Sequence, residues 1–577
     1  MNALLDLARP LMPHLMLAPI GLPMLTAAVM LLMREERQRL KLALNLLSTA
    51  LGLALACVLL VWTHQDGATH PIGVYLQGNW QAPFGIVLVL DRLSALMLVL
   101  SGVLALCALL FAGARWHRAG VHFHTLFQFQ LMGLAGAFLT ADLFNLFVFF
   151  EIMLAASYGL LLHGSGRARV QAGLHYIAIN LAASSLFLIG ASMLYGITGT
   201  LNMADLANSI AQVSAPDRGL LHTAAAILAT AFLIKAAVWP LNFWLVPAYG
   251  SAAAPVGALF AIMTKVGVYT LLRLWTLMFG PEAGASAQFG SLWLTCAGLA
   301  TMVFGAVGMM GSQRLTHLAG HAAVLSSGTL LAALGLGQTQ LIAALLYYLP
   351  SSTLAVGALF LLADLIDRWR NHGATLMNYE DEEAPFLEDE EAPFLTPELV
   401  PRAGINLDED EEVLVGRVIP AAAAFLGLAF LACTLVIAGM PPLSGFVGKF
   451  AMFTALLNPL GLASSAGTQP GPAGWLLLGL MLATGLLALL ALTRSGIRHF
   501  WARQDSSAPQ LRVLEGLPIA LLLGACVLLT VYAQPVMRYT TATANALHAP
   551  ATYIRAVFEA APIAAPQPAH PGSAGTP

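Results

Sequence analysis

Residues 232–240 read FLIKAAVWP and place a lysine and a proline inside an apolar run that extends from about 220 to 246. A charged side chain at the centre of a bilayer costs at least about 2.5–3.5 kcal/mol, so it faces the protein interior or a water-filled cavity. Broken helix is tolerated at membrane depth only where protein or water satisfies the freed backbone groups. The stretch therefore predicts a membrane-spanning helix that is interrupted next to a buried lysine.

The composition around this stretch is that of a membrane protein. Of the 577 residues, 58% are hydrophobic and only 10% are charged, against about 25% charged in soluble domains. A spanning helix needs about 20 apolar residues. We predict an all-α polytopic membrane protein with about 14 transmembrane helices, at 12–33, 42–63, 86–112, 122–140, 143–163, 172–197, 220–246, 252–275, 291–311, 318–336, 341–366, 418–438, 474–493 and 516–534.

Basic residues collect in alternate connections between these helices, for example at 34–41 in the first and 494–512 in the thirteenth. Cytoplasmic loops collect Lys and Arg. The alternation predicts a multi-pass protein of the bacterial cytoplasmic (inner) membrane, with both termini on the non-cytoplasmic side.

A second interruption, GMPPLSG at 439–445, lies in helix 12 as the first lies in helix 7. Interrupted helices at corresponding places in two halves point to an inverted-repeat transporter. We predict two inverted five-helix repeats, helices 4–8 and 9–13, with discontinuous helices 7 and 12.

The expected domain organisation follows from these repeats and from one acidic run. DEEAPFL occurs at 381–387 and again at 389–395, and such like-charge runs stay disordered. We read the run as a cytoplasmic linker, with a docking segment for a partner as the alternative. The predicted boundaries are 1–112 for helices 1–3, 113–280 for the first repeat, 281–379 for the start of the second, 380–412 for the linker, 413–495 for the rest of the second, and 496–577 for helix 14 and the tail.

Three of the four lysines, Lys235, Lys265 and Lys449, lie inside apolar runs, whereas the arginines lie at loops and helix ends. Buried Lys changes its protonation state readily and Arg does not. Glu151 lies eight residues into helix 5, about 12 Å at 1.5 Å per residue, and Lys235 is its expected partner. These residues predict proton movement, with a static buried salt bridge as the alternative.

The sequence contains no motif typical of soluble nucleotide-binding proteins or hydrolases. There is no Walker A motif, no dinucleotide-binding GxGxxG and no nucleophile elbow, and the five cysteines are scattered singly through apolar runs. We expect no cofactor, no metal site and no nucleic-acid partner. Among the histidines near the helices, His321 is the one candidate proton relay.

The segments 232–245, 254–259 and 264–269 resemble the antiporter-like subunits of respiratory complex I and of the Mrp-type (Pha) multisubunit monovalent cation/proton antiporters. The residues around 141–151 and 347–365 are most similar to the Mrp D subunits. The resemblance implies that Glu151 and Lys235 form a gating pair, that Lys265 is a central relay, and that Lys449 hands protons to the far side.

The chain departs from this family where helices 10 and 11 commonly carry His or Lys, because the corresponding positions are uncharged here. The relay from Lys265 to Lys449 then needs water or other protonatable groups. The candidates are His321, Ser326, Ser327, Ser351 and Ser352.

Three functions remain open. The first is a proton-translocating subunit of a multisubunit secondary Na⁺(K⁺)/H⁺ antiporter, a transporter rather than an enzyme, with other membrane subunits, lipids, protons and Na⁺ or K⁺ as partners. The second is a proton-pumping subunit of a complex I-like or membrane hydrogenase complex. The third is a scaffold subunit that does not transport.

Overall fold

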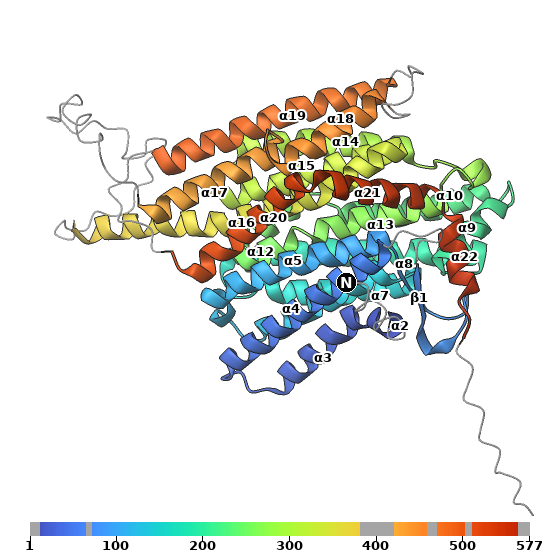
Figure 1. The fold of residues 1–577 in the computed structure, drawn as a ribbon, viewed down its shortest axis with the longest axis horizontal. Coiled ribbons are helices and arrows are strands. Elements are labelled where there is room, and N and C mark those ends of the chain that lie inside the picture. Colours follow the sequence, from blue (N-terminus) through green and yellow to red (C-terminus); the bar gives the residue numbers. More distant parts are fainter. Residues whose placement is uncertain (1–11, 65–71, 381–419, 459–469, 502–510, 563–577) are drawn as a thin grey trace, which may run out of the picture.

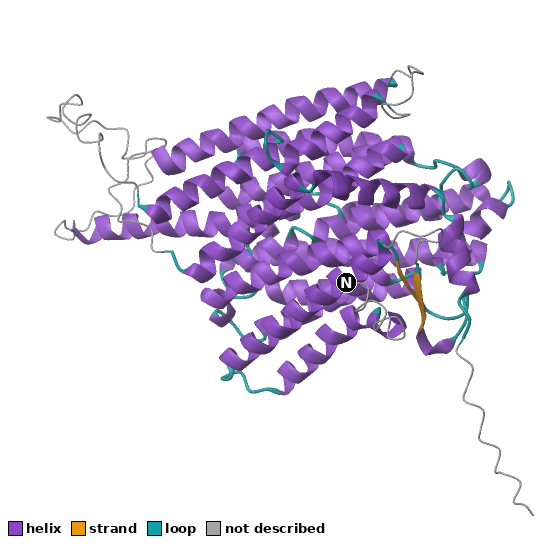
Figure 2. Cartoon of the chain, viewed as in Figure 1, coloured by secondary structure: helices purple, strands orange, loops and turns teal. Residues whose placement is uncertain are grey.

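The computed structural model describes residues 12–64, 72–380, 420–458, 470–501 and 511–562. Most of these residues are helical, and the long helices run side by side in one bundle (Figures 1 and 2). Twelve helices among the described residues are long and apolar enough to cross a membrane, with Ala254–Met278 counted as one helix. The predicted runs 12–33 and 122–140 form the shorter helices α3 (Ala18–Leu32) and α6 (Phe123–Leu139), of 15 and 17 residues.

The first part of the chain also contains two strands, which pair antiparallel with Gly73 opposite Leu90. Its other elements are α2 (Met12–Leu15), α4 (Gln38–Thr63), β1 (Gly73–Leu76), η2 (Gln77–Asn79), β2 (Val87–Leu90), α5 (Arg92–Ala114), η3 (Trp116–Arg118), α7 (Leu143–Leu161), α8 (Arg167–Thr198), α9 (Met203–Gln212) and α10 (Arg218–Lys235). The second part contains α11 (Leu245–Ser251), α12 (Ala254–Phe260), α13 (Met263–Met278), η4 (Gly284–Ser286), α14 (Ser291–Gly311), α15 (Leu315–Leu336), α16 (Thr339–Glu380), α17 (Ala421–Ala438), α18 (Ser444–Leu457), α19 (Pro472–Gly496), η7 (Ile497–Trp501), α20 (Val513–Val531), α21 (Ala533–His548) and α22 (Ala551–Glu559).

Glycines set how closely neighbouring helices approach. A Cβ added at Gly136 of α6 would lie 2.1 Å from the Phe149 ring of α7, and one at Gly298 of α14 would lie 2.3 Å from the Ala332 nitrogen of α15. Membrane helices associate by packing rather than by the hydrophobic effect, and small residues let their backbones come together. These two contacts hold α6 against α7 and α14 against α15.

Both predicted interruptions are present. Helix α10 ends at Lys235 and α11 begins at Leu245, and α17 ends at Ala438 while α18 begins at Ser444. The second break begins at Gly439, whose φ of +77° lies in the left-handed region that glycine adopts without steric cost. A further break, between α12 and α13, was not predicted because residues 261 and 262 are Ala and Ile. It directly precedes Lys265.

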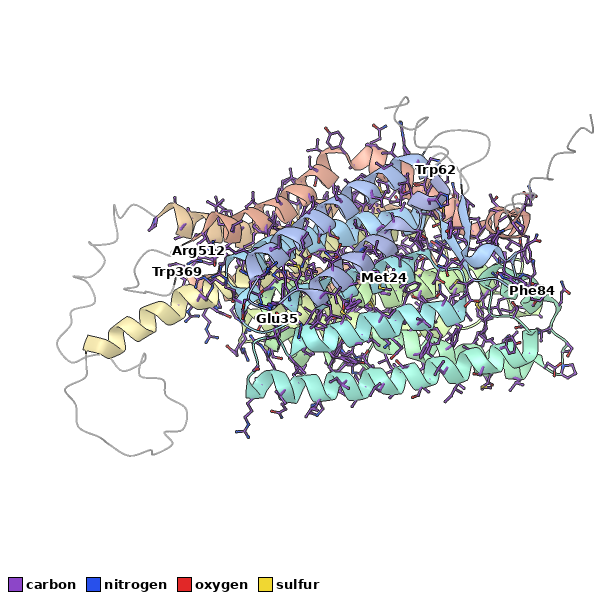
Figure 3. All side chains as sticks on the ribbon, turned by 90° about the horizontal axis from the view of Figure 1, so that it is seen from below. Met24, Glu35, Trp62, Phe84, Trp369 and Arg512 are labelled. Atoms are coloured by element: carbon purple, nitrogen blue, oxygen red, sulfur yellow. The ribbon has the colours of Figure 1, made fainter. Side chains whose placement is uncertain are left out.

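The connections lie at two ends of the bundle. Figure 3 shows Glu35, Trp369 and Arg512 at one end and Trp62 and Phe84 at the other. The first, eleventh and thirteenth predicted connections therefore share an end, as the alternation of basic residues requires.

Two predicted features fall outside the part of the chain that the structure describes. The acidic linker 380–412 is described only at its first residue, and residues 1–11 and 563–577 at the termini are not described. The sidedness of the termini thus remains a prediction.

Candidate functional site: a row of buried lysines and hydroxyls

Lys235 is the last residue of α10, where the helix breaks. Its side chain is buried, and its Nζ donates a hydrogen bond of 3.2 Å to Oδ1 of Asn180 on α8. The ammonium group is thus held by a neutral amide from a neighbouring helix.

Glu151 projects from α7 and accepts a hydrogen bond from the Ser184 hydroxyl, also on α8. Among the described ion pairs, none joins Glu151 to Lys235 within 4.0 Å. Asn180 and Ser184 are four residues apart and therefore lie on the same face of α8. One face of α8 thus offers a polar side chain to each member of the predicted gating pair.

Sequence reasoning did not identify these two bridging residues. The signal was an Asn and a Ser at i and i+4 within the apolar run 172–197. Such polar pairs in a membrane helix mark the face that contacts other helices.

Lys265 lies one turn after the break between α12 and α13. It is 1% exposed, and its Nζ donates a hydrogen bond of 3.2 Å to the Ser327 hydroxyl on α15. Gly267 allows α13 to approach the end of α10, because a Cβ there would lie only 2.7 Å from the Ala236 nitrogen. The two lysine-bearing helices are therefore in close contact.

A cavity of about 10 Å³ lies between these helices, lined by Asn180, Lys235, Met263 and Val266 among others. A water molecule needs about 10–15 Å³ measured in this way. The cavity is large enough for one water molecule beside the Lys235 ammonium. Met263 and Val266 of α13 line it.

Five buried serines continue from Lys265 toward the second half. Ser326 donates a hydrogen bond of 2.8 Å to Ser352 on α16, and the hydroxyls of Ser351 and Ser444 are also 2.8 Å apart. Ser326 and Ser327 are neighbours on α15, and Ser351 and Ser352 are neighbours on α16. Hydroxyl contacts thus link α15, α16 and α18.

Lys449 completes the row, one and a half turns after Ser444 on α18. Its Nζ donates to the Ala438 carbonyl at 2.8 Å and reaches the Ile437 carbonyl at 3.4 Å. The last carbonyls of a helix have no partner within it and carry partial negative charge. The break after α17 therefore supplies the acceptors for this ammonium group.

Gly439 makes room for the Lys449 side chain. A Cβ at Gly439 would lie 2.4 Å from Cδ of Lys449. The glycine thus serves both the left-handed turn of the chain and the position of the lysine.

His321 is not in contact with the row. Its ring packs against Gly308 and Phe304 of α14, and its buried Nδ1 has no hydrogen-bond partner among the described residues. The structure joins the four predicted serines to the row and places His321 in the interface between α14 and α15.

The whole arrangement is an internal row of protonatable amines and hydroxyls at helix breaks within a polytopic membrane protein. The described residues contain no group of three or more His, Cys, Asp or Glu that could hold a metal ion. Buried ionisable groups that face a bundle interior are typical of ion and proton pathways. The fold and the row define a membrane protein of the ion-translocating class.

Comparison with known proteins agrees with this class. Residues 140–381 match the model of the family described as NADH:quinone oxidoreductase/Mrp antiporter, TM. A probable K⁺/H⁺ antiporter D subunit of Rhizobium meliloti is 49% identical over 549 residues, which cover 95% of this chain and 98% of that protein. A Na⁺/H⁺ antiporter D subunit of Bacillus subtilis is 30% identical, over 95% of this chain and all of that protein.

Solved structures resemble the whole chain. A chain of the Mrp complex from Dietzia sp. DQ12-45-1b aligns with a TM-score of 0.76 and 25% identity, over 95% of this chain and 99% of that one. A chain of respiratory complex I from Thermus thermophilus has the same fold, with a TM-score of 0.69 and 22% identity over 93% and 99% of the two chains. This protein therefore belongs to the NADH:quinone oxidoreductase/Mrp antiporter family, within the group of antiporter D subunits.

Proposed function

We propose that the chain is the proton-translocating subunit of a multisubunit secondary Na⁺(K⁺)/H⁺ antiporter of the cytoplasmic membrane. Its relatives named as K⁺/H⁺ and Na⁺/H⁺ antiporter D subunits support this function. In this proposal α3 and α6 span the membrane together with the twelve longer helices. The resulting fourteen helices contain two inverted five-helix repeats, and both termini lie on the non-cytoplasmic side.

One observation carries the proposal, namely a set of five hydrogen-bonded side-chain pairs between Glu151 and Lys449. The pairs are Glu151–Ser184, Asn180–Lys235, Lys265–Ser327, Ser326–Ser352 and Ser351–Ser444. A packed apolar interior does not need buried polar side chains for its stability, because each buried polar group must find a hydrogen-bond partner. Successive links with room for water provide a route for protons.

The mechanism follows from the chemistry of each link. An amine accepts and releases a proton, and a hydroxyl donates one hydrogen bond while accepting others. Water would have to connect Lys235 with Lys265, which does not line the small cavity beside Lys235, and the serine pairs would carry the connection on toward Lys449. Glu151 stabilises charge on Lys235, so a movement that brings the two side chains closer together would change when Lys235 releases its proton.

The cation is exchanged by the complex to which this subunit contributes. The relatives' names include both K⁺ and Na⁺, so the proposal covers either ion. A complex I-like pumping subunit is the second candidate, and its support is the shared fold with the Thermus thermophilus chain. Cation-dependent proton flux without any electron donor separates the antiporter from such a redox-driven pump.

The test uses the whole complex in everted membrane vesicles, with Lys235→Ala as the variant. We expect cation-driven proton flux to fall to background, while Thr295→Val keeps the wild-type rate. Thr295 is a suitable control because it is buried and its hydroxyl donates only within its own helix, to the Ser291 carbonyl. Unchanged flux in Lys235→Ala, with the complex assembled, would favour a scaffold that does not transport.

A further inference from the structure

Two cavities lie beside the first half of α5, and no described residue that lines them belongs to the lysine row. The first has a volume of about 320 Å³, and we call it the polar cavity because Asp91, Arg92 and Arg273 line it. The second has a volume of about 440 Å³, and we call it the apolar groove. Its lining residues include Leu60, Leu96, Val99, Val103, Leu354 and Leu528.

The two cavities adjoin at the end of the bundle where α5 begins. Thr63 lines the polar cavity, and the next residue, His64, lines the groove. On α5, Leu96 of the groove follows Arg92 of the polar cavity by four residues, which places both on one face of the helix. Tyr539 of α21 also lines the groove, and its hydroxyl donates to the Arg92 carbonyl at 2.7 Å. The groove therefore leads along α5 to the polar cavity.

The depth of the groove matches one leaflet of a bilayer. Helix α5 begins at Arg92 and has 23 residues, enough to cross the membrane. Val103, the groove residue furthest along α5, lies eleven residues after Arg92, which corresponds to about 16 Å at 1.5 Å per residue. The hydrocarbon core of a bilayer is about 30 Å thick. The groove thus extends from one surface of the membrane to about its midplane.

The groove is open to the outer surface of the bundle. Leu528 in its wall is 57% exposed, and Val99 is half-buried. Pro350, which lies inside α16, also lines it, and a proline within a helix removes a backbone hydrogen bond and kinks the helix. On the other side, α20 ends at Val531 and α21 begins at Ala533 in a new direction (Figure 1). Helices that bend in this way leave space beside the straight α5.

The polar cavity has more positive than negative side chains among its described residues. The Arg273 guanidinium donates to both oxygens of Asp91 at 2.6 Å, and the Arg273 side chain is buried. Arg92 is also buried, and its Nε donates to the Thr63 carbonyl at 3.1 Å. Two guanidinium groups against one carboxylate favour a ligand with a single negative charge. Arginine is the residue best suited to bind phosphate oxygens.

We propose that the polar cavity and the apolar groove together bind one anionic phospholipid, with its phosphate beside Arg92 and an acyl chain in the groove. Basic pockets between membrane helices bind lipid head groups in this way. The competing explanation is a helix of a partner subunit that covers the groove. A membrane-spanning helix would pack along the whole of α5, whereas the groove ends halfway, so the dimensions favour the lipid chain.

The experiment uses the purified whole complex in detergent and two photoreactive lipids. Phosphatidylglycerol and phosphatidylcholine with the same diazirine-bearing acyl chain are each added and irradiated, and the labelled peptides are identified by mass spectrometry. We expect phosphatidylglycerol to label residues 96–103 and 525–536. Phosphatidylcholine should label them about tenfold less, because its choline adds a positive charge beside two arginines. Excess inorganic phosphate should leave the labelling unchanged, because it lacks the acyl chain.

The groove is tested with Val99→Trp, which fills it with a larger side chain. Labelling of residues 525–536 by phosphatidylglycerol should fall about tenfold, since the indole occupies the volume that the acyl chain needs. Val58→Trp is the matched control and should keep the wild-type labelling. Val58 lies on the neighbouring helix α4, is 40% exposed and lines neither cavity.

The polar cavity is tested with Arg92→Gln, which removes the charge and keeps a hydrogen-bond donor. Labelling by phosphatidylglycerol should fall to the level of phosphatidylcholine. Arg218→Gln is the matched control, because Arg218 also donates to a backbone carbonyl, that of Val213, and lines neither cavity. Lys235→Ala should retain the labelling although it abolishes proton flux, so the lipid site and the proposed function fail separately.

Four results would overturn the inference. Equal labelling by the two lipids would remove the role of the arginines, and displacement by inorganic phosphate would indicate a site for free anions. Labelling of a partner subunit in place of residues 96–103 would show that a partner helix covers the groove. Wild-type labelling in Val99→Trp would place the acyl chain elsewhere. If a variant fails to assemble, the two lipids and the phosphate competition on the wild-type complex decide alone.

Discussion

Lys235 lies at the start of the first helix break and Lys449 follows the second, and their ammonium groups are held in different ways. Lys235 donates to the Asn180 side chain, and the Glu151 carboxylate accepts from Ser184 on the same face of α8. Lys449 donates to the backbone carbonyls of Ala438 and Ile437. The first site depends on side chains that can rotate, and the second on the fixed end of a helix.

This difference gives the two lysines different roles in the proposed row. A side-chain acceptor can move away, so the environment of Lys235 is adjustable and suits a gate. Helix-end carbonyls favour positive charge permanently, by about 0.3–1 kcal/mol at exposed helix ends and more in partly buried ones. Lys449 therefore suits the role of the last proton-binding group, which releases its proton to water or to a partner subunit.

The largest expected effect comes from removing the ability of either lysine to release a proton. Lys235→Arg and Lys449→Arg keep the positive charge, but Arg stays protonated at any working pH. Each should lower the initial rate of cation-driven proton flux about 100-fold or more in everted vesicles. If Lys449→Arg kept the wild-type rate, Lys449 would only cap α17 and would have no part in proton release.

A smaller effect is expected from the acceptor that distinguishes the first site. Asn180→Leu removes the hydrogen bond to the Lys235 ammonium, and a hydrogen bond to a charged group contributes about 1.5–3 kcal/mol. We expect flux to fall about tenfold or more, measured as initial rate against the amount of assembled complex. Asn180→Gln, which retains an amide, should recover part of the rate, and equal rates for Leu and Gln would remove Asn180 from the gate.

The bridge between the two sites gives the smallest effect. Ser351→Ala and Ser444→Ala each remove one hydroxyl of the 2.8 Å contact, and we expect each to lower flux about threefold because water can replace a single hydroxyl. The double variant should be no slower than either single one, since both remove the same hydrogen bond. A multiplicative loss would show that the two hydroxyls act on separate routes.

The sequence predicted the lysines and breaks because their signals are local. A lysine in an apolar run and a Gly-Pro interruption both violate the rule for an ordinary membrane helix, so Lys235, Lys265, Lys449 and the break after Gly439 stand out without any knowledge of packing. The break before Lys265 has no such signal, because Ala261 and Ile262 are common in continuous helices. Only the packed structure shows it.

The contacts between helices required the tertiary structure. Ser and Asn are frequent in membrane helices, and the chain alone does not say which of them face each other. For this reason the prediction paired Glu151 directly with Lys235 and left out Asn180 and Ser184, which lie on a third helix. The same limit applied to His321, which shares α15 with Ser326 and Ser327 but faces α14.

The sequence by itself determined a helical membrane protein with three buried lysines, because the cost of burying charge in a bilayer makes such residues conspicuous. The tertiary structure decided which groups hold each ammonium, since hydrogen-bond partners 55, 62 and 11 residues apart are brought together only by helix packing. Whether a charged residue is buried depends on one segment and can be predicted from the sequence. Which groups hydrogen-bond to it depends on two segments and is set only in the folded bundle.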